Sequence, residues 1–213
     1  MSLTDHKKRA AKIVAFLKKA YPDSGCSLHY ESAHQLLVAT ILSAQASDEQ
    51  VNKVTPALFV KYRSIEDFAA ADMTALEDGI RSIGLCRNKA KSIKHSAVMI
   101  LHEFGGVIPD TLDEITRLPG VGRKTGSVLL GTWYHKAEGI VVDTHVKRLA
   151  KLLGLTKHQD PDKVEKDLMG IIGKKDWIIL THLMIDHGRA VCIARRPKCE
   201  ICVLRKICPS ARV

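Results

Sequence analysis

Apolar residues recur at helical spacing along most of this chain, and no other feature restricts the possible fold as strongly. Over residues 7–21 the repeat comprises Ala10, Ile13, Val14, Leu17 and Tyr21. A spacing of three or four positions places these side chains on one face of an amphipathic helix. Residues 33–45 are apolar nearly all round, as expected of a central buried helix. No segment shows a convincing two-residue period, and only Gly139–Val142 is a brief candidate for a strand. The sequence therefore predicts an all-α fold.

Helix start and stop signals divide the chain into short elements joined by short connections. Ser47 with Gln50, and Thr111 with Glu114, have the spacing of capping boxes. A proline follows Asp160, which is typical of a helix N-terminus. From such signals we expect helices over about 7–21, 33–45, 48–62, 73–81, 88–104, 112–117, 123–134, 144–153, from 161 onward and over 175–190.

The charge of the chain indicates a polyanionic partner. Its 213 residues include 33 lysines and arginines against 23 acidic residues, a net charge of +10. Neutralising phosphates with such residues releases counterions from nucleic acid; a merely solvated basic surface is the alternative. Aromatic residues make up only 5%, which argues against a stacking platform for single strands. No apolar run reaches the roughly 18 residues of a spanning helix, and the N-terminus lacks a signal-peptide core, so we expect a soluble, cytoplasmic protein.

The run Leu-Pro-Gly-Val-Gly-Arg-Lys at 118–124 is the most informative motif. Its two glycines allow positive φ and a close approach of ligand to backbone, and N–H groups at a turn and helix start can cradle a phosphate. Lys124 follows in the first helical turn, where the macrodipole disfavours an ammonium ion, as a nucleophilic amine requires. Local chemistry favours a phosphate contact for Lys124 and leaves a nucleophile as the alternative.

Four of the six cysteines crowd the C-terminal end as Cys192-x6-Cys199-x2-Cys202-x5-Cys208. Nothing indicates an oxidising compartment, so a metal centre is a better interpretation than disulfides. Zinc sites normally show two Cys-x2-Cys pairs, whereas a [4Fe-4S] cluster is held by four thiolates. The spacing favours iron–sulfur and leaves zinc open.

Basic side chains surround these cysteines, with Glu200 the one acid among them. They are Arg189, Arg195, Arg196, Lys198, Arg205, Lys206 and Arg212. Such a surface suits a phosphate backbone; balancing the charge of a thiolate-bound cluster is a second role, and both can hold. Asp143 also has two interpretations. It is either a plain helix N-cap or a carboxylate that stabilises positive charge on a sugar ring and helps a proton leave Lys124.

Several motifs together resemble the endonuclease III family of helix–hairpin–helix DNA glycosylases, which remove oxidised pyrimidines. They are Leu-Pro-Gly-Val-Gly-Arg-Lys-Thr at 118–125, Val-Asp-Thr-His-Val-Lys-Arg-Leu at 142–149, His-Gly-Arg-Ala-Val-Cys at 187–192 with the cysteine tail, Leu-Ser-Ala-Gln-Ala-Ser-Asp at 42–48 and Ile-Gly-Leu-Cys-Arg-Asn-Lys-Ala at 83–90. They occur in the order of that family, over about residues 30–208.

The resemblance implies roles for individual residues. Lys124 is the nucleophile, and Asp143 is the essential carboxylate. Gln45 and Leu85 match residues that fill the gap left by an extruded nucleotide, with a helix-end polar group and an ordinary turn hydrophobe as the alternatives. The hairpin residues that grip DNA phosphate through the backbone are Pro119, Gly120, Val121 and Gly122. The ligands of one [4Fe-4S] cluster are Cys192, Cys199, Cys202 and Cys208.

The resemblance also implies an all-α, two-lobed architecture with the lysine and the carboxylate facing each other across a groove. The implied parts are a six-helix barrel lobe over 23–137 with its helix–hairpin–helix at about 111–131, and an iron–sulfur cluster lobe over 1–22 plus 138–213 with its cysteine loop at 192–208. The implied activity is base excision repair. The resemblance implies a DNA N-glycosylase and AP lyase that acts on double-stranded DNA containing damaged pyrimidines or abasic sites. It also implies a monomer that is associated with the nucleoid and has no membrane partner. The implied enzyme cleaves 3′ to the abasic site by β-elimination through a lysine Schiff base.

Relatives with this fold differ at positions that the sequence shows. Adenine-mispair and thymine-mismatch glycosylases keep the cluster but usually lack the lysine, and the adenine enzymes carry a catalytic glutamate where this chain has about Thr40. The 8-oxoguanine lyases keep the lysine but lack the cysteine tail. Gly126-Ser127 departs from the common Ala-Asn of the family, and a glycine inside a helix costs roughly 1 kcal/mol relative to alanine. The rival classes are a non-catalytic DNA-binding protein and a metal protein whose hairpin only packs.

Overall fold

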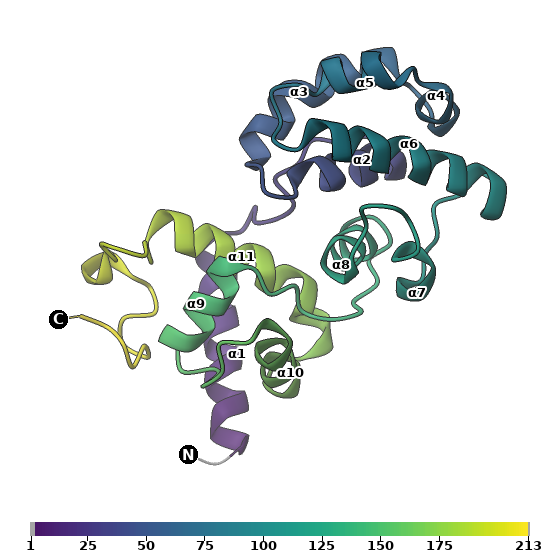
Figure 1. Ribbon diagram of the computed structural model, residues 1–213. Coiled ribbons are helices and arrows are strands. Elements are labelled where there is room, and N and C mark those ends of the chain that lie inside the picture. Colours follow the sequence, from purple (N-terminus) through teal and green to yellow (C-terminus); the bar gives the residue numbers. More distant parts are fainter. Residues whose placement is uncertain (1–2, 213) are drawn as a thin grey trace. The chain divides into compact units, whose positions relative to one another are not determined.

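The computed structural model describes residues 3–212, and every regular element in that range is helical (Figure 1). The all-α prediction is therefore confirmed. The candidate strand over Gly139–Val142 is wrong, because the segment is irregular. It has no neighbouring strand to pair with, and the Thr181 hydroxyl donates to the Val141 carbonyl instead (3.1 Å). No helix within residues 3–212 is both long enough and apolar enough to cross a bilayer.

The chain divides into two compact units. One is Ser27–Lys136, which we call the hairpin unit, and the other is Met1–Cys26 with Ala137–Val213, which we call the cysteine unit. The hairpin unit contains α2 (Ala33–Ser43), α3 (Asp48–Lys61), α4 (Ile65–Ala70), α5 (Met73–Gly79), α6 (Cys86–Glu103), α7 (Leu112–Ile115) and α8 (Arg123–Thr132). The cysteine unit contains α1 (Leu3–Ala20), α9 (Thr144–Leu152), α10 (Pro161–Ile171), α11 (Trp177–Ala190) and two short 3₁₀ turns, η1 (Lys174–Asp176) and η2 (Cys199–Ile201).

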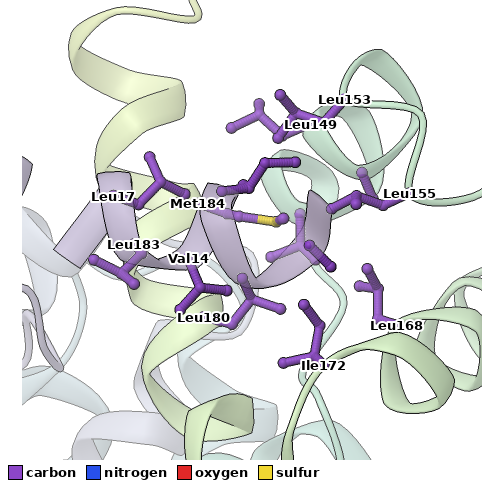
Figure 2. Close-up of a cluster of buried hydrophobic side chains, with 14 of the residues drawn as sticks. Val14, Leu17, Leu149, Leu153, Leu155, Leu168, Ile172, Leu180, Leu183 and Met184 are labelled. Carbon is purple, nitrogen blue, oxygen red and sulfur yellow. The ribbon is translucent and has the colours of Figure 1, made fainter. Parts of the chain in front are cut away.

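Helices α1, α9, α10 and α11 share one hydrophobic core (Figure 2). Each contributes fully buried side chains, among them Leu17, Leu149, Leu168 and Leu183. These are the apolar positions that repeat at helical spacing, so one face of each helix covers the others. The partly buried side chains packed against this core include Cys192, Cys202 and Cys208. The cysteine loop is thus attached to the hydrophobic core of its unit.

Side chains cap the helices where the sequence indicates. The N-caps whose side chains accept from the backbone N–H three positions on include Ser47, Asp72, Thr111, Asp143 and Asp160. The reciprocal bond of both predicted capping boxes, from the N-cap backbone N–H to the side chain three residues on, is wrong. At the second box the Glu114 carboxylate accepts from the Thr111 hydroxyl (2.7 Å). The Gln50 amide does not turn back to the N-cap but donates to the Ser82 hydroxyl (3.0 Å), which joins α3 to the turn before α6.

Two short helices differ from expectation. Helix α4 is not predicted, because its capping box uses Asp67 as the reciprocal acceptor in place of the usual Glu or Gln. Helix α5 ends at Gly79, two residues before the expected end at Arg81. Elements of six or seven residues span fewer than two turns, so the apolar repeat has too few members to define them.

Candidate functional site

The glycine hairpin is anchored in its unit by buried apolar side chains and by α6. Leu118 and Val121 are both buried, and the Val121 N–H donates to the Leu118 carbonyl (3.0 Å). The Ser96 hydroxyl donates to the Pro119 carbonyl (2.8 Å). These contacts fix the turn and leave Gly122, which is exposed, as the N-cap of α8.

The two glycines of the hairpin have different roles. Gly120 has φ +79°, and a Cβ there would lie 2.7 Å from Cβ and Oγ of Ser92. The conformation and the space both require glycine at this position. Gly122 has φ −86°, and a Cβ there would meet nothing within 4 Å. The fold therefore needs Gly120, whereas Gly122 keeps the backbone open to a ligand.

Gly120→Ala is expected to destabilise the protein by about 2–4 kcal/mol, because the left-handed conformation and the contact with Ser92 both become unfavourable. Gly122→Ala is the matched control and should change the stability by less than about 1 kcal/mol. Urea denaturation of the two variants measures the difference. Equal stabilities would contradict the assignment of distinct roles.

The first turn of α8 presents backbone donors and a lysine at the surface. N–H groups in the first turn of a helix have no intrahelical acceptor, and Gly122 supplies no side-chain cap. An anion bound there gains those donors and the positive end of the macrodipole. Lys124 is the second residue of α8 and is exposed. Its amine is therefore accessible to a ligand held at this turn.

Asp143 is the N-cap of α9, as the sequence predicts, and is partly buried in the cysteine unit. Its Oδ1 accepts from the Val146 N–H (2.7 Å). The bond holds the carboxylate at a helix N-terminus, where negative charge is favoured. Oδ2 takes no part in this bond, so the group combines a fixed position with an oxygen that can face a cation.

Gln45 and Leu85 share an unusual backbone conformation. Their φ values are 58° and 60°, and His135 is the one other non-glycine residue with positive φ among those described. Both side chains are exposed, and Leu85 presents 57% of its surface. A left-handed conformation costs a non-glycine residue roughly 1–2 kcal/mol, and such strain concentrates at functional sites. Neither φ value can be predicted from the residue type.

The four tail cysteines line one cavity of about 360 Å³. All four are free thiols and are partly buried. No three of the described His, Cys, Asp and Glu side chains converge closely enough to hold a single metal ion. Four thiols around a shared volume fit a [4Fe-4S] cluster, which is held by one thiolate at each iron. Burial raises the pKa of the Cys192 and Cys202 thiols, and a bound metal supplies the positive charge that keeps such thiols ionised.

His187, on α11, begins the motif at 187–192, but its contact with one of these thiols is not predicted from the sequence. Its Nε2 lies 3.4 Å from Sγ of Cys202, and its Nδ1 lies 2.9 Å from the Tyr21 hydroxyl. Burial, with a smaller effect of the Arg148 guanidinium, lowers the pKa of His187 to about 4, so the ring is neutral near pH 7. A neutral ring carries one N–H. When Cys202 serves as a thiolate ligand, that N–H faces the sulfur and Tyr21 donates to Nδ1.

Arg148 contacts one of the tail cysteines. Its Nη1 donates to the Cys192 carbonyl and lies 3.9 Å from Sγ of the same residue. The seven basic residues of the tail are all exposed. Those that line the thiol cavity are Lys198, Arg205 and Arg212. The tail is therefore placed both to neutralise a cluster and to present positive charge at the surface.

Gly126, which departs from the family pattern, has a packing reason. It is buried in α8, and a Cβ there would lie 2.8 Å from Cγ2 of Ile115 and 3.3 Å from Cδ1 of Leu112. Alanine would gain roughly 1 kcal/mol of helix propensity but would push against α7. The glycine lets α7 and α8 approach closely at the helix–hairpin–helix.

The candidate residues fall into two groups. The hairpin unit holds Gln45, Leu85, the hairpin glycines and Lys124, whereas the cysteine unit holds Asp143 and the four cysteines. Within the cysteine unit the four thiols lie together around one cavity. Within the hairpin unit, Lys124 follows the glycine turn directly at the start of α8.

Comparisons with known proteins identify the family. A family model described as "HhH-GPD superfamily base excision DNA repair protein" matches residues 38–174, and one described as "Iron-sulfur binding domain of endonuclease III" matches residues 192–208. Endonuclease III of Synechocystis sp. is 49% identical over 99% of this chain and 96% of its own length. Endonuclease III of Bacillus subtilis is 42% identical over 88% of this chain and 86% of its own length.

Solved structures agree with the sequence comparisons. A structure described as a trapped endonuclease III–DNA covalent intermediate has a TM-score of 0.89 and 42% identity, covering 96% of both chains. A thermostable thymine-DNA glycosylase at 23% identity shares the fold, with a TM-score of 0.82. A helical fold, a glycine hairpin followed by a lysine, and a cysteine-lined cavity are thus found together with matches over nearly the whole chain. The chain belongs to the endonuclease III family of HhH-GPD base excision DNA repair proteins, and it is a DNA glycosylase and AP lyase with a [4Fe-4S] cluster.

Proposed function

We propose that this protein removes oxidised pyrimidines from double-stranded DNA and cleaves the strand 3′ to the resulting abasic site, with Lys124 as the nucleophile. The observation that carries the proposal is the exposed Lys124, placed two residues beyond Gly122 at the start of α8. The endonuclease III whose solved structure has a TM-score of 0.89 was trapped as a covalent intermediate with DNA. The protein acts as a monomer on chromosomal DNA in the cytoplasm. The hairpin unit, whose seven helices α2–α8 include those of the six-helix barrel, corresponds to the barrel lobe, and the cysteine unit corresponds to the iron–sulfur cluster lobe.

The backbone of Pro119, Gly120, Val121 and Gly122 binds the phosphate of the strand that carries the lesion. Pro119 has no N–H and the Val121 N–H donates to the Leu118 carbonyl, so the donors for the anion are the glycine N–H groups and the N-terminus of α8. The net charge of +10 strengthens the approach to DNA. The damaged nucleotide leaves the base stack, which is easiest where pairing is already weak. Gln45 and Leu85 fill the gap that it leaves.

The Lys124 amine attacks C1′ of the deoxyribose, and the bond to the base breaks with its electron pair on the base, which takes up a proton. The Asp143 carboxylate stabilises the positive charge on the sugar and accepts the proton that leaves Lys124. Opening of the sugar ring gives a Schiff base between Lys124 and C1′. The iminium acidifies the C2′ proton, and its loss expels the 3′ phosphate by β-elimination. Water then releases Lys124 unchanged.

The cluster is held by Cys192, Cys199, Cys202 and Cys208. Four protein thiolates leave no open coordination position, so the metal centre serves to shape the cysteine loop. Exposed basic side chains on that loop then meet the phosphate backbone as a fixed surface. No free cofactor or magnesium ion is needed for the steps above.

A panel of defined duplexes tests the proposed substrate class. Duplexes carrying thymine glycol or an oxidised cytosine should be cut by the wild-type protein, whereas an undamaged duplex should not. Matched duplexes with an adenine mispair or a G·T mismatch serve as controls for the related glycosylases. Preferential release of adenine or of mismatched thymine would contradict the proposal, even if the strand were cleaved afterwards.

A further inference from the structure

Lys89 lies in an unusual place for a lysine. It is buried within α6, with 5% of its surface exposed. Its Nζ donates to the Leu42 carbonyl near the end of α2 (2.8 Å), three residues before Gln45. Its backbone N–H donates to the Leu85 carbonyl (3.0 Å), at the start of α6. One residue therefore contacts both segments that carry the exposed side chains Gln45 and Leu85, which we call the two tips.

A second hydrogen bond joins the same segments on the other flank of the tips. The Gln50 side-chain amide donates to the Ser82 hydroxyl (3.0 Å). Gln50 lies on α3, five residues after Gln45, and Ser82 lies in the turn before α6, three residues before Leu85. The tips thus lie between two cross-links, one formed by Lys89 and one by Gln50. Each cross-link restricts how far the tips can move apart.

The Lys89 bond is the stronger of the two links. An ammonium donor makes hydrogen bonds about twice as strong as a neutral pair, and carbonyls near a helix C-terminus carry partial negative charge. Burial lowers the pKa of Lys89, so the charged group is held at some cost. Leu42 itself has no exposed surface. Loss of the donor would therefore leave a buried carbonyl without its partner.

We propose that Lys89 is a positioning residue that, with the Gln50–Ser82 bond, fixes the spacing of Gln45 and Leu85 so that both enter the gap left by an extruded nucleotide. The inference rests on the proposed function for the role of the tips, and adds the element that holds them. Both tips have positive φ, and a strained conformation persists only where its surroundings determine it. The two cross-links supply that determination.

Borohydride trapping on two abasic substrates, with the cluster-containing protein, tests the role of Lys89. Duplex DNA with an abasic site requires the gap to be filled, whereas a single-stranded abasic oligonucleotide has no opposite strand and no gap. Lys89→Met keeps the length of the side chain and removes the donor. It should slow trapping on the duplex about tenfold or more, as expected for a displaced positioning group, and leave the single-strand rate within about twofold.

Lys94→Met is the matched control on the same helix. Lys94 Nζ donates to the Ala71 carbonyl (2.6 Å), so this variant loses the same kind of bond at a helix end away from the tips. Its ratio of duplex to single-strand trapping should equal that of the wild type. A Gln50→Ala variant removes the exposed Gln50–Ser82 bond, which involves no buried charge. It should also lower the ratio of duplex to single-strand trapping rates, by a smaller factor than Lys89→Met.

The decisive comparison is made in a background that lacks both tips, Gln45→Ala with Leu85→Gly. There Lys89→Met should produce no further fall in the ratio, because nothing remains for it to position. Two results would overturn the inference and make Lys89 a general packing residue. One is that Lys89→Met lowers the ratio of duplex to single-strand trapping rates as much in that background as in the wild type. The other is that Lys89→Met slows trapping equally on both substrates. The absence of any wild-type adduct on either substrate would instead refute the proposed lyase chemistry.

Discussion

Lys124→Ala is expected to abolish the covalent adduct with abasic DNA and to lower the rate of strand cleavage at least about a thousandfold, as expected when a nucleophile is removed. No other group in the proposed mechanism forms the bond to C1′. Lys124 is exposed in the first turn of α8, so the change should leave the fold intact. Borohydride trapping measures the adduct, and circular dichroism checks the fold.

Lys124→Arg is the control that separates the two interpretations of this lysine. Arginine keeps the positive charge and contacts phosphate well, so affinity for an abasic duplex should stay close to wild type. The guanidinium remains protonated and is a poor nucleophile, so the adduct should still be lost. An arginine variant that retained lyase activity would make position 124 a phosphate contact and refute its role as the nucleophile.

Removal of one tail cysteine is expected to have the second-largest effect. Cys202→Ala should reduce bound iron from about four atoms per chain to nearly none, because an all-cysteine [4Fe-4S] cluster depends on four thiolates. The basic loop that carries the three remaining thiols packs on the core of the cysteine unit. Without a cluster to join these thiols, the loop should lose its fixed shape. Affinity for duplex DNA should then fall together with the visible absorption of the cluster.

Cys86→Ala provides the matched control for this prediction. Cys86 is a free cysteine at the start of α6 in the hairpin unit and is not among the residues that line the thiol cavity. Its replacement should leave the iron content and the visible spectrum unchanged. Full iron content in Cys202→Ala, or a stoichiometric zinc ion in the wild type, would contradict the assignment of the four ligands.

The fold could be predicted well where the sequence carries long repeats and strong caps. Helix α1 repeats its apolar positions over several turns, and Asp143 and Asp160 mark the starts of α9 and α10. Prediction failed for α4, which is short and begins with an atypical capping box. It also failed at Gln50, whose side chain donates to Ser82 across the unit. Contacts between distant segments are set by tertiary packing, which local patterns do not encode.

The candidate site shows the same division between local and tertiary information. The glycines, Lys124 and the cysteine spacing are visible as motifs because each lies in one short segment. His187 and Lys89 also lie within motifs, but their roles cannot be read from those motifs, because the roles arise from burial beside Cys202 and beside the Leu42 carbonyl. A lysine in an amphipathic helix is expected on the solvent side. Only the packed structure shows that Lys89 points inward.

The most direct test of the central claim is to locate the covalent bond. The wild-type protein is trapped with borohydride on an abasic duplex, digested, and analysed by mass spectrometry for the peptide that carries the reduced sugar. We predict a single modified residue, Lys124, in the peptide that follows the glycine hairpin. A modification at another lysine or at the N-terminal amine, with Lys124 unmodified, would contradict the account.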